Sequence, residues 1–227
     1  TDAVIVLTGS TSEYNDPYTL RVVDRDATGF SFVVDGWEYQ SGLKSRTETV
    51  NWVAVSAGVH ELEDGRIIEA GTVLADQSSG SVAFTADFGV QSPVVVTSVM
   101  SSLDVTAVDS DPINVTSAGF DARLQAEEAR ADDARSKELV GYIAFGAGGT
   151  VQRVENAFQF GTTIRYGESL SSPVVVADTQ TRNDPETQAL MFWRAPGSSS
   201  ASIFTQEERS GDGEGSRAAM ERAGFAA

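Results

Sequence analysis

Three pairs of glutamates recur along the chain, and each pair flanks a polar stretch of similar length. The pairs are Glu38 with Glu48, Glu128 with Glu138, and Glu208 with Glu221, and they enclose 9, 9 and 12 residues. If the strands on either side form a hairpin, both carboxylates of a pair lie near the base of the loop. Like charges that face each other across two strands are destabilising. Each pair therefore needs a compensating positive charge, from a bound cation or from an arginine.

The residues around these pairs offer both kinds of compensation. Ca²⁺ takes about six to eight oxygen ligands, and the loops add the acidic residues Asp132, Asp133, Asp212 and Glu214. An arginine also lies two to four residues before the second glutamate of each pair: Arg46, Arg135 and Arg217. We favour charge-assisted hydrogen bonds from these arginines and retain Ca²⁺ as the alternative. A glycosidase-like acid and base are disfavoured, because catalytic carboxylates are not expected in every repeat.

A second group of side chains has the chemistry of a sugar-binding site. It consists of Trp37, Tyr39, Trp193 and Arg194. An aromatic plane packs against the C–H groups of a sugar, and a guanidinium group donates paired hydrogen bonds. The sequence therefore predicts carbohydrate contacts at these four residues, with packing inside the protein as the alternative for Trp37.

Composition excludes several classes of function. The chain has no cysteine and one histidine, His60, which rules out disulfides, a thiolate nucleophile and a cysteine-based zinc site. It has no glycine-rich phosphate loop between a strand and a helix and no serine with a plausible histidine partner. A net charge of −17 disfavours nucleic acids and anionic membranes as partners. We therefore expect neither an enzyme nor a nucleic-acid-binding protein.

The acidic, lysine-poor composition is typical of a protein in a salty extracellular setting, where screening relieves self-repulsion. The only lysines are Lys44 and Lys137. A genomic preference for arginine codons is the alternative explanation. The longest uncharged stretch, residues 88–103, is too polar for a membrane helix of about 20 residues, so we expect no membrane insertion.

One pattern of apolar and aromatic residues occurs three times. It opens with AVIV at residues 3–6, PVVV at 93–96 and PVVV at 173–176, with spacings of 90 and then 80 residues. It closes with Trp52, Tyr142 and Phe225 in one equivalent position, for which we predict burial in the core. Three copies of one supersecondary unit are indicated, and we call them the first, second and third copy.

The patterning within the copies predicts strands. Apolar residues alternate with other residues over 30–34, 120–124, 50–54 and 140–144, the period of a half-buried strand. Residues 125–139 are rich in Ala, Glu and Arg and favour a helix when taken alone. The corresponding stretches of the other copies contain glycines that suit a loop: Gly42, Gly211, Gly213 and Gly215. We therefore predict an all-β protein, with a helical turn at most in residues 125–139.

The order of these signals resembles the H-type lectin family. In the second copy it is carried by VAFTADF at 82–88, SPVVV at 92–96, INVT at 113–116, SAGFDARL at 117–124 and VGYIA at 140–144. The resemblance implies tandem antiparallel six-stranded β-sandwiches: residues 1–58, which lack the first strands, then 59–149 and 150–227. It also implies binding of carbohydrate, commonly N-acetylgalactosamine, between the subunits of a trimer.

The strands missing from residues 1–58 leave open sheet edges, which are liable to aggregate. We expect upstream sequence, in preference to a neighbouring chain, to supply them. Short linkers and unequal copies favour a string of units over a closed ring.

These features together predict a non-catalytic extracellular or cell-surface protein that binds glycans or surface polysaccharide in adhesion. The alternative is a structural subunit or spacer of a virion, fibre or cell-surface assembly. Such a subunit has no sugar site and contacts neighbouring chains, including further molecules of its own kind.

Overall fold

A computed structural model describes residues 2–10, 17–40, 48–131, 133, 135–157, 161–211 and 219–227. The described residues form seventeen strands and one short 3-10 turn, Glu128–Arg130, with no α-helix. The predicted all-β class is therefore confirmed. The turn also confirms the prediction that residues 125–139 form at most a helical turn.

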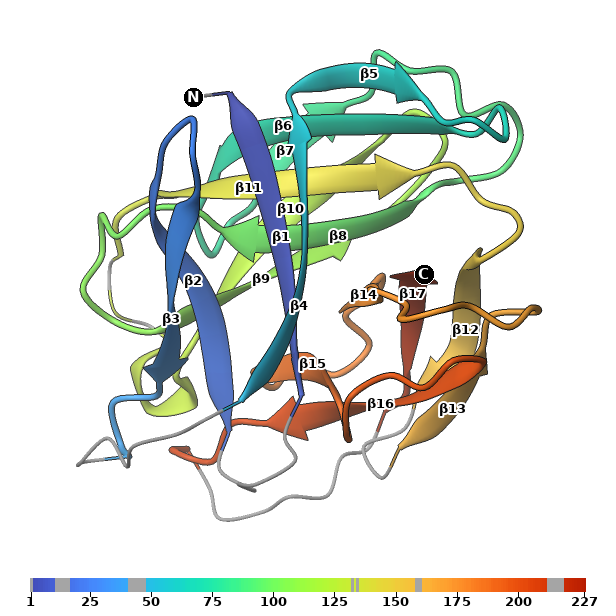
Figure 1. The fold of residues 1–227 in the computed structure, drawn as a ribbon. Helices are drawn as coiled ribbons and strands as arrows, with labels where there is room; N and C mark the ends of the chain where they lie inside the picture. Colours follow the sequence, from blue (N-terminus) through green and yellow to red (C-terminus); the bar gives the residue numbers. More distant parts are fainter. Residues whose placement is uncertain are drawn as a thin grey trace.

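The strands follow the three copies in chain order (Figure 1). The first copy holds β1 (Ala3–Ser10), β2 (Tyr18–Arg25), β3 (Phe30–Gly36) and β4 (Thr49–Ser56). The second holds β5 (Gly58–Glu61), β6 (Ile67–Ala75), β7 (Gly80–Ala83), β8 (Val94–Val99), β9 (Val108–Ile113), β10 (Gly119–Ala126) and β11 (Glu138–Phe145). The third holds β12 (Val151–Ala157), β13 (Thr162–Arg165), β14 (Val176–Thr179), β15 (Gln188–Phe192), β16 (Ser200–Glu207) and β17 (Glu221–Ala226).

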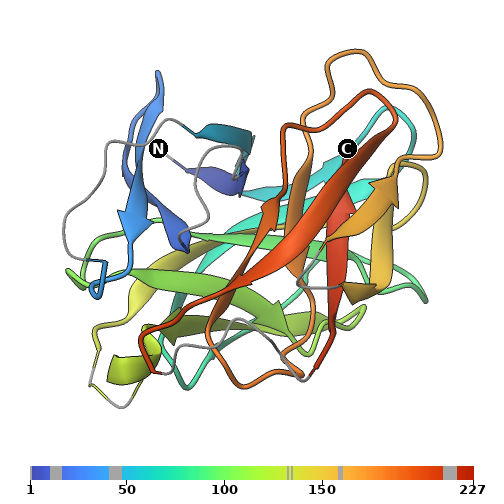
Figure 2. The ribbon, with the colours of Figure 1, turned by 90° about the horizontal axis from the view of Figure 1, so that it is seen from below.

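The strands form four sheets, and two of these sheets combine strands from different copies. The sheet orders are β13-β16-β15-β1-β4, β7-β10-β9, β3-β2-β8-β11-β6-β5 and β12-β17-β14. The first copy joins the third where β1 runs parallel to β15, and it joins the second where β2 runs parallel to β8. Figure 2 shows the blue, green and red parts of the chain packed against one another. The expectation of a string is therefore wrong, because the first and third copies pair directly.

The same strand order recurs within the sheets. The second copy contributes β6-β11-β8 and β7-β10-β9, and the third contributes β12-β17-β14 and β13-β16-β15. The first copy contributes only the pairs β4-β1 and β3-β2. The described residues of the first copy therefore include no counterparts of the strands β6 and β7.

The opening strands of the three copies meet in the middle of the molecule and are buried on both faces, as in fully buried strands. All six residues of β8 and all four of β14 are buried. One hydrophobic cluster contains Val4, Val94 and Val176, one residue from each copy. The copies therefore share this cluster, while two further clusters lie wholly within the second and the third copy.

Three side chains at matching positions also link these central strands. Thr8, Ser98 and Asp178 are separated by 90 and then 80 residues, and each accepts a hydrogen bond from the backbone of another copy. The bonds run from Ala177 N to Thr8 Oγ1 at 3.0 Å, from Leu7 N to Ser98 Oγ at 2.9 Å and from Thr97 N to Asp178 Oδ2 at 2.9 Å. The donors Leu7, Thr97 and Ala177 are spaced in the same way. Each copy thus bonds to the next in one closed cycle.

The position shared by Trp52, Tyr142 and Phe225 differs from the prediction. Tyr142 and Phe225 are buried, with 6% and 1% of their surface exposed, but Trp52 is 50% exposed. Phe32, in the strand predicted over residues 30–34, is 39% exposed. The physical reason is that, among the described residues, the first copy has no strands in the places where β6 and β7 cover the second copy.

Candidate functional site

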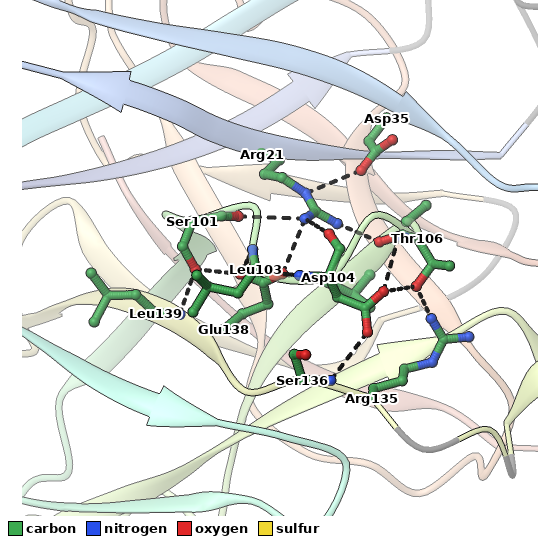
Figure 3. A network of polar contacts seen from close by, with 12 residues as sticks. Arg21, Asp35, Ser101, Leu103, Asp104, Thr106, Arg135, Ser136, Glu138 and Leu139 are labelled. Atoms are coloured by element: carbon green, nitrogen blue, oxygen red, sulfur yellow. Dashed lines mark hydrogen bonds and ion pairs between the residues drawn. The ribbon is translucent and has the colours of Figure 1, made fainter.

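The second glutamate of the middle pair, Glu138, begins β11 and is fully buried. Its two carboxylate oxygens accept hydrogen bonds from the loop after β8: Leu103 N at 3.1 Å, Asp104 N at 2.7 Å and the Ser101 hydroxyl (Figure 3). Its positive partner is Arg21 of the first copy, with Nη1 3.2 Å from the Glu138 carboxylate and Nε 3.1 Å from that of Asp35. Glu138 therefore anchors a loop and joins two copies.

Glu221 does the same work in the third copy. It begins β17, is fully buried and accepts hydrogen bonds from Asn183 N and Asp184 N, each at 2.8 Å. Its other oxygen accepts the Thr181 hydroxyl at 2.5 Å. Glu48 stands directly before β4 of the first copy, and the loop that follows β1 there lies outside the described residues. Two of the three predicted second glutamates thus have both oxygens bonded to protein groups.

Arg21, which pairs with Glu138, is not among the arginines predicted to compensate these glutamates. Arg135 donates to the Thr106 hydroxyl (Figure 3), whereas Arg46 and Arg217 lie outside the described residues. Glu138 pairs with Arg21, which is separated from it by 117 residues. No local spacing could reveal that partner, because two different copies bring it into place.

The premise that each glutamate pair closes a hairpin is wrong. β10 pairs with β7 and β9, whereas β11 pairs with β6 and β8, so the strands that carry Glu128 and Glu138 belong to different sheets. β3 and β4, and likewise β16 and β17, are separated in the same way. The two members of a pair therefore do not face each other across neighbouring strands.

The first glutamates of the pairs also bond across copies. Glu38 Oε1 accepts Ala107 N at 2.6 Å, and Glu128 Oε1 accepts Thr187 N at 3.4 Å. Glu208 Oε2 accepts Glu128 N at 2.8 Å, just as Glu127 Oε2 accepts Glu38 N at 3.0 Å. By its contacts, Glu208 therefore corresponds to Glu127. The sequence pattern had matched it with Glu128, the next residue.

The described residues contain one group of three acidic side chains close enough to share a cation. The oxygens of Glu128, Glu186 and Glu207 lie within 4.8 Å of one another. Only Glu128 belongs to the predicted metal ligands. Of the predicted loop acids, Asp133 is exposed and Asp132, Asp212 and Glu214 lie outside the described residues. Calcium stays a prediction.

The four predicted sugar-binding residues lie in different surroundings. Trp37 is 2% exposed, so its ring offers no face to a saccharide. The predicted sugar contact at Trp37 is therefore wrong, and the alternative, packing inside the protein, is observed. Tyr39 and Trp193 are exposed by 38% and 46%, and Arg194 next to Trp193 is exposed as well. The Trp193 ring packs edge-on against Phe204 at 5.1 Å between centroids. Tyr39, Trp193 and Arg194 remain accessible, but none of them lines the pocket described next.

A pocket of about 480 Å³ lies where the second and third copies meet. The second copy contributes Arg123 on β10 and the residues that follow β9, and the third contributes the loop after β14 and a residue of β17. Eight polar residues line it: Asn114, Thr116, Arg123, Gln180, Thr181, Arg182, Asn183 and Arg222. Three arginines thus converge in a protein whose net charge is −17. We call this the arginine pocket.

Two of these guanidinium groups retain unused hydrogen-bonding capacity. Arg123 Nε and Arg182 Nη1 are buried and have no hydrogen-bond partner, whereas Arg182 Nη2 donates to Pro185 O. Arg222 is partly neutralised by Glu155, at 2.7 Å. Burial and the neighbouring Arg123 charge lower the pKa of Arg182. A buried donor without a partner costs free energy, so this pocket is suited to an oxygen-rich, negatively charged group.

A buried carboxyl lies behind the pocket. Asp111 accepts hydrogen bonds from the Thr179 hydroxyl at 2.8 Å and from Gln125 Nε2. Burial raises the pKa of Asp111 to about 6, against the opposing effects of Thr179 and of the Arg182 charge. Burial, followed by the charge of Asp111, also raises the pKa of Asp178. The protonation of this acidic cluster therefore influences the field in which the arginines act.

Sequence reasoning missed the arginine pocket because its parts come from two copies. Arg123 looks like an ordinary polar residue of an alternating strand, and Arg182 stands in a loop. The scarcity of positive charge was the available signal: 16 basic residues against 33 acidic ones make any cluster of three arginines unusual.

Comparison with known proteins gives one significant similarity. The chain is 29% identical to halomucin of Haloquadratum walsbyi over 154 residues, which are 67% of this chain and 2% of halomucin. No protein-family model and no solved structure matches the chain. The similarity to halomucin is compatible with the predicted place at a cell surface. Among the described residues, no helix has the length and apolar character needed to span a membrane.

Proposed function

We propose that this chain is a non-catalytic glycan-binding module of a surface protein and that the arginine pocket receives an acidic saccharide. The observation that carries the proposal is the convergence of Arg123, Arg182 and Arg222 in a strongly acidic chain, with two buried guanidinium N–H groups left unpaired. Such donors bind carboxylate and sulfate groups in pairs and with defined geometry.

The remaining lining of the pocket fits the neutral part of a saccharide. Asn114, Thr116 and Asn183 offer amide and hydroxyl groups that match sugar hydroxyls. A volume of about 480 Å³ falls within the range of about 300–1,000 Å³ that is common for small-molecule sites. The ligand class that satisfies both halves of the pocket is a uronic-acid or sulfated sugar.

The proposal extends to the architecture. The recurring orders β6-β11-β8 with β7-β10-β9, and β12-β17-β14 with β13-β16-β15, support six-stranded sandwiches of the H-type lectin kind at residues 59–149 and 150–227. They also support an incomplete sandwich at residues 1–58. Four sheets could also belong to a four-bladed propeller, but propeller blades repeat radially, whereas two sheets here join strands of different copies. The arginine pocket then lies between two sandwiches of a pseudo-threefold assembly.

A structural role in a surface assembly is the second candidate. It is favoured by β3 and β4, which stand at the ends of their sheets and offer unpaired edges to other chains. The similarity to halomucin supports either role at a cell surface. Binding to glycans distinguishes the two, because a spacer needs no sugar site.

The test is a glycan array followed by calorimetric titration with the best acidic oligosaccharide, at 0.15 M and at high salt. Losing one charged hydrogen bond costs about 1.5–3 kcal/mol, so we expect Arg182→Ala and Arg123→Ala to weaken binding about 10- to 100-fold. Arg165→Ala is the matched control, because Arg165 is exposed on β13 and outside the pocket. The array is run with Ca²⁺ and with chelator, which also tests the predicted cation.

Two results would contradict the proposal. One is an absence of binding to every acidic glycan at either salt concentration. The other is an equal loss of affinity in the Arg182→Ala and Arg165→Ala variants, which would indicate nonspecific attraction to positive charge. A loss of binding with chelator alone would move the site to the acidic group of Glu128, Glu186 and Glu207.

A further inference from the structure

The exposed side of the first copy carries an apolar groove of about 560 Å³. Its lining includes Ile5, Phe30, Phe32, Trp52 and Ala54, from strands β1, β3 and β4. Three of these are aromatic, and two of the three, Phe32 and Trp52, are exposed to water, which is unfavourable for apolar surface. A groove of this kind indicates a surface that another element covers.

The register of the strands shows what covers the same surface elsewhere. Trp52 pairs with Leu7 across β4 and β1, as Tyr142 pairs with Thr97 and Phe225 with Ala177. On their other side, β11 pairs with β6 and β17 pairs with β12, but β4 is the last strand of its sheet. In the other sheet β10 pairs with β7, while β3 has no such neighbour. In the part of the first copy that the structure describes, two strands are therefore without a counterpart.

The packing of individual aromatic rings shows the same difference between the first and second copies. Phe30 and Trp52 meet edge to face at 5.2 Å and 74°, and Phe120 and Tyr142 meet at 5.2 Å and 68°. In the second copy a further ring, Phe84, lies on this pair, 5.8 Å from Phe120 and 6.4 Å from Tyr142. The segment between β7 and β8 contributes Phe84. Nothing in the described part of the first copy takes that place over Trp52.

We propose that the groove receives two β-strands from a segment of polypeptide joined to the N-terminal side of β1. In both complete copies the covering strands directly precede the central strand: β6 and β7 come before β8, and β12 and β13 come before β14. A segment attached ahead of β1 reaches the groove by the same short path. The similar stretch of halomucin is 2% of that protein, so polypeptide adjoins it there.

The groove also specifies the chemistry of this segment. One strand adds to the free edge of β4 and the other to the free edge of β3, by backbone hydrogen bonds as in β-strand addition. Inward side chains alternate with outward ones and must be apolar to cover Phe32 and Trp52, which are 39% and 50% exposed. An aromatic residue follows the second strand and covers Phe30 and Trp52. It lies about ten residues before β1, because Phe84 precedes Val94 by ten and Tyr166 precedes Val176 by ten.

The second copy supplies a probe for this proposal. Residues 67–90 hold β6, β7 and Phe84, and fusing them ahead of Thr1 reproduces the spacing of 90 residues between the first and second copies. In a Trp193→Phe variant, acrylamide quenching of tryptophan fluorescence distinguishes the exposed Trp52 from the buried Trp37. We expect the extension to lower quenching to the level of a Trp52→Phe, Trp193→Phe variant. We also expect it to raise the unfolding midpoint by several degrees, about 2–4 °C for each kcal/mol gained.

Two matched extensions serve as controls. Val73→Pro in the fused segment removes a backbone donor from the middle of a strand and is expected to abolish both effects. Phe84→Ala is expected to keep the gain in the unfolding midpoint in part but to leave Trp52 open to quencher. If the fusion does not fold, a synthetic peptide of residues 67–90 added to the unmodified chain provides the same two readings.

The proposal fails if the extension leaves quenching and unfolding midpoint the same as the proline control. It also fails if the unmodified chain sediments as a stable dimer in which Trp52 is already shielded, because a second molecule then occupies the groove. Neither outcome bears on the arginine pocket, which lies between the second and third copies.

Discussion

At the scale of single residues, a buried ion pair connects two copies of this chain. Arg21 and Glu138 are almost completely buried, with 3% and 0% of their side chains exposed. The hydrogen bonds to Ser101, Leu103 and Asp104 surround the same carboxylate. A buried charge that loses its partner is costly, even where the intact pair contributes little net stability. The pair therefore constrains how the first and second copies meet.

Glu138→Leu is expected to destabilise the protein by about 3–5 kcal/mol, because it leaves the Arg21 guanidinium buried with Asp35 as its main partner. Urea denaturation measures the change. Adding Arg21→Met is expected to recover about 0.5–3 kcal/mol, the usual coupling between contacting residues. Glu155→Ala is the control, since the pair of Glu155 with Arg222 is exposed and such pairs contribute about 0–1 kcal/mol. If the losses in free energy of unfolding were additive in the double variant, Arg21 and Glu138 would not be coupled.

The buried Asp111 predicts a pH dependence with a definite sign. Because its pKa is raised to about 6 in the folded protein, its contribution to stability is complete below pH ~4, the ordinary aspartate pKa. As pH rises from about 4 through 6, the unfolded chain loses this proton first and the free energy of unfolding falls, by up to about 2–3 kcal/mol.

Asp111→Asn is expected to flatten this fall, as measured by urea denaturation at several pH values between 4 and 7. The control is Glu63→Gln, which removes one charge from an exposed turn. An unchanged profile in the Asp111→Asn variant would contradict the assignment, as would equal flattening in both variants.

Single residues also show how far the sequence could be interpreted. Tyr142 and Phe225 are buried as predicted, but their equivalent Trp52 is exposed, since the repeat pattern identifies a position and not the strands that cover it. Trp37 looked accessible beside Glu38 and is buried. The partner of Glu138 was unpredictable because Arg21 belongs to another copy. Contacts across copies depend on how the copies pack, and one-dimensional spacing does not contain that information.

At the scale of elements, glycines permit the close approach of neighbouring copies. A Cβ atom at Gly141 of β11 would lie 2.0 Å from Met100 Sδ and 3.2 Å from Val4 of the first copy. A Cβ atom at Gly224 of β17 would lie 2.6 Å from Val94 of the second copy. Each glycine directly precedes the aromatic residue of its closing strand, Tyr142 or Phe225. Each also faces the preceding copy. They mark where the strands of adjacent copies touch.

Gly224→Ala is therefore expected to cost about 1–3 kcal/mol, the usual penalty for adding a carbon to a packed core. Thermal and urea unfolding measure it. Gly29→Ala is the control, because nothing lies within 4 Å of a Cβ atom there. If both variants unfold at the same midpoint, the copies are not in close contact at Gly224.

The strands themselves were largely predictable. Alternating residues identified β3, β4, β10 and β11, and glycines in the sister copies correctly argued against a helix over residues 125–139. The pairing of strands was not predictable by the same route. Residues adjacent in sequence suggested hairpins, yet β10 and β11 belong to different sheets, because successive strands of a copy pair with strands that are not their neighbours in sequence.

At the scale of the whole molecule, the net charge of −17 opposes the packing of three copies against one another. Salt reduces this repulsion, since the Debye length falls from about 10 Å at 0.1 M to about 3 Å at 1 M. We expect the unfolding midpoint to rise between these concentrations by at least about 2–4 °C, equivalent to about 1 kcal/mol. Differential scanning calorimetry in NaCl measures the effect, and a midpoint that falls with salt would contradict it.

The central claim is that the three copies close on one another, so that residues of different copies share their sites. Small-angle X-ray scattering at 1 M NaCl tests it most directly, because the radius of gyration depends on how the copies are arranged. A closed molecule of 227 residues is expected to give about 17 Å. A string of three separate units would give about 25 Å or more, and that result would contradict the account.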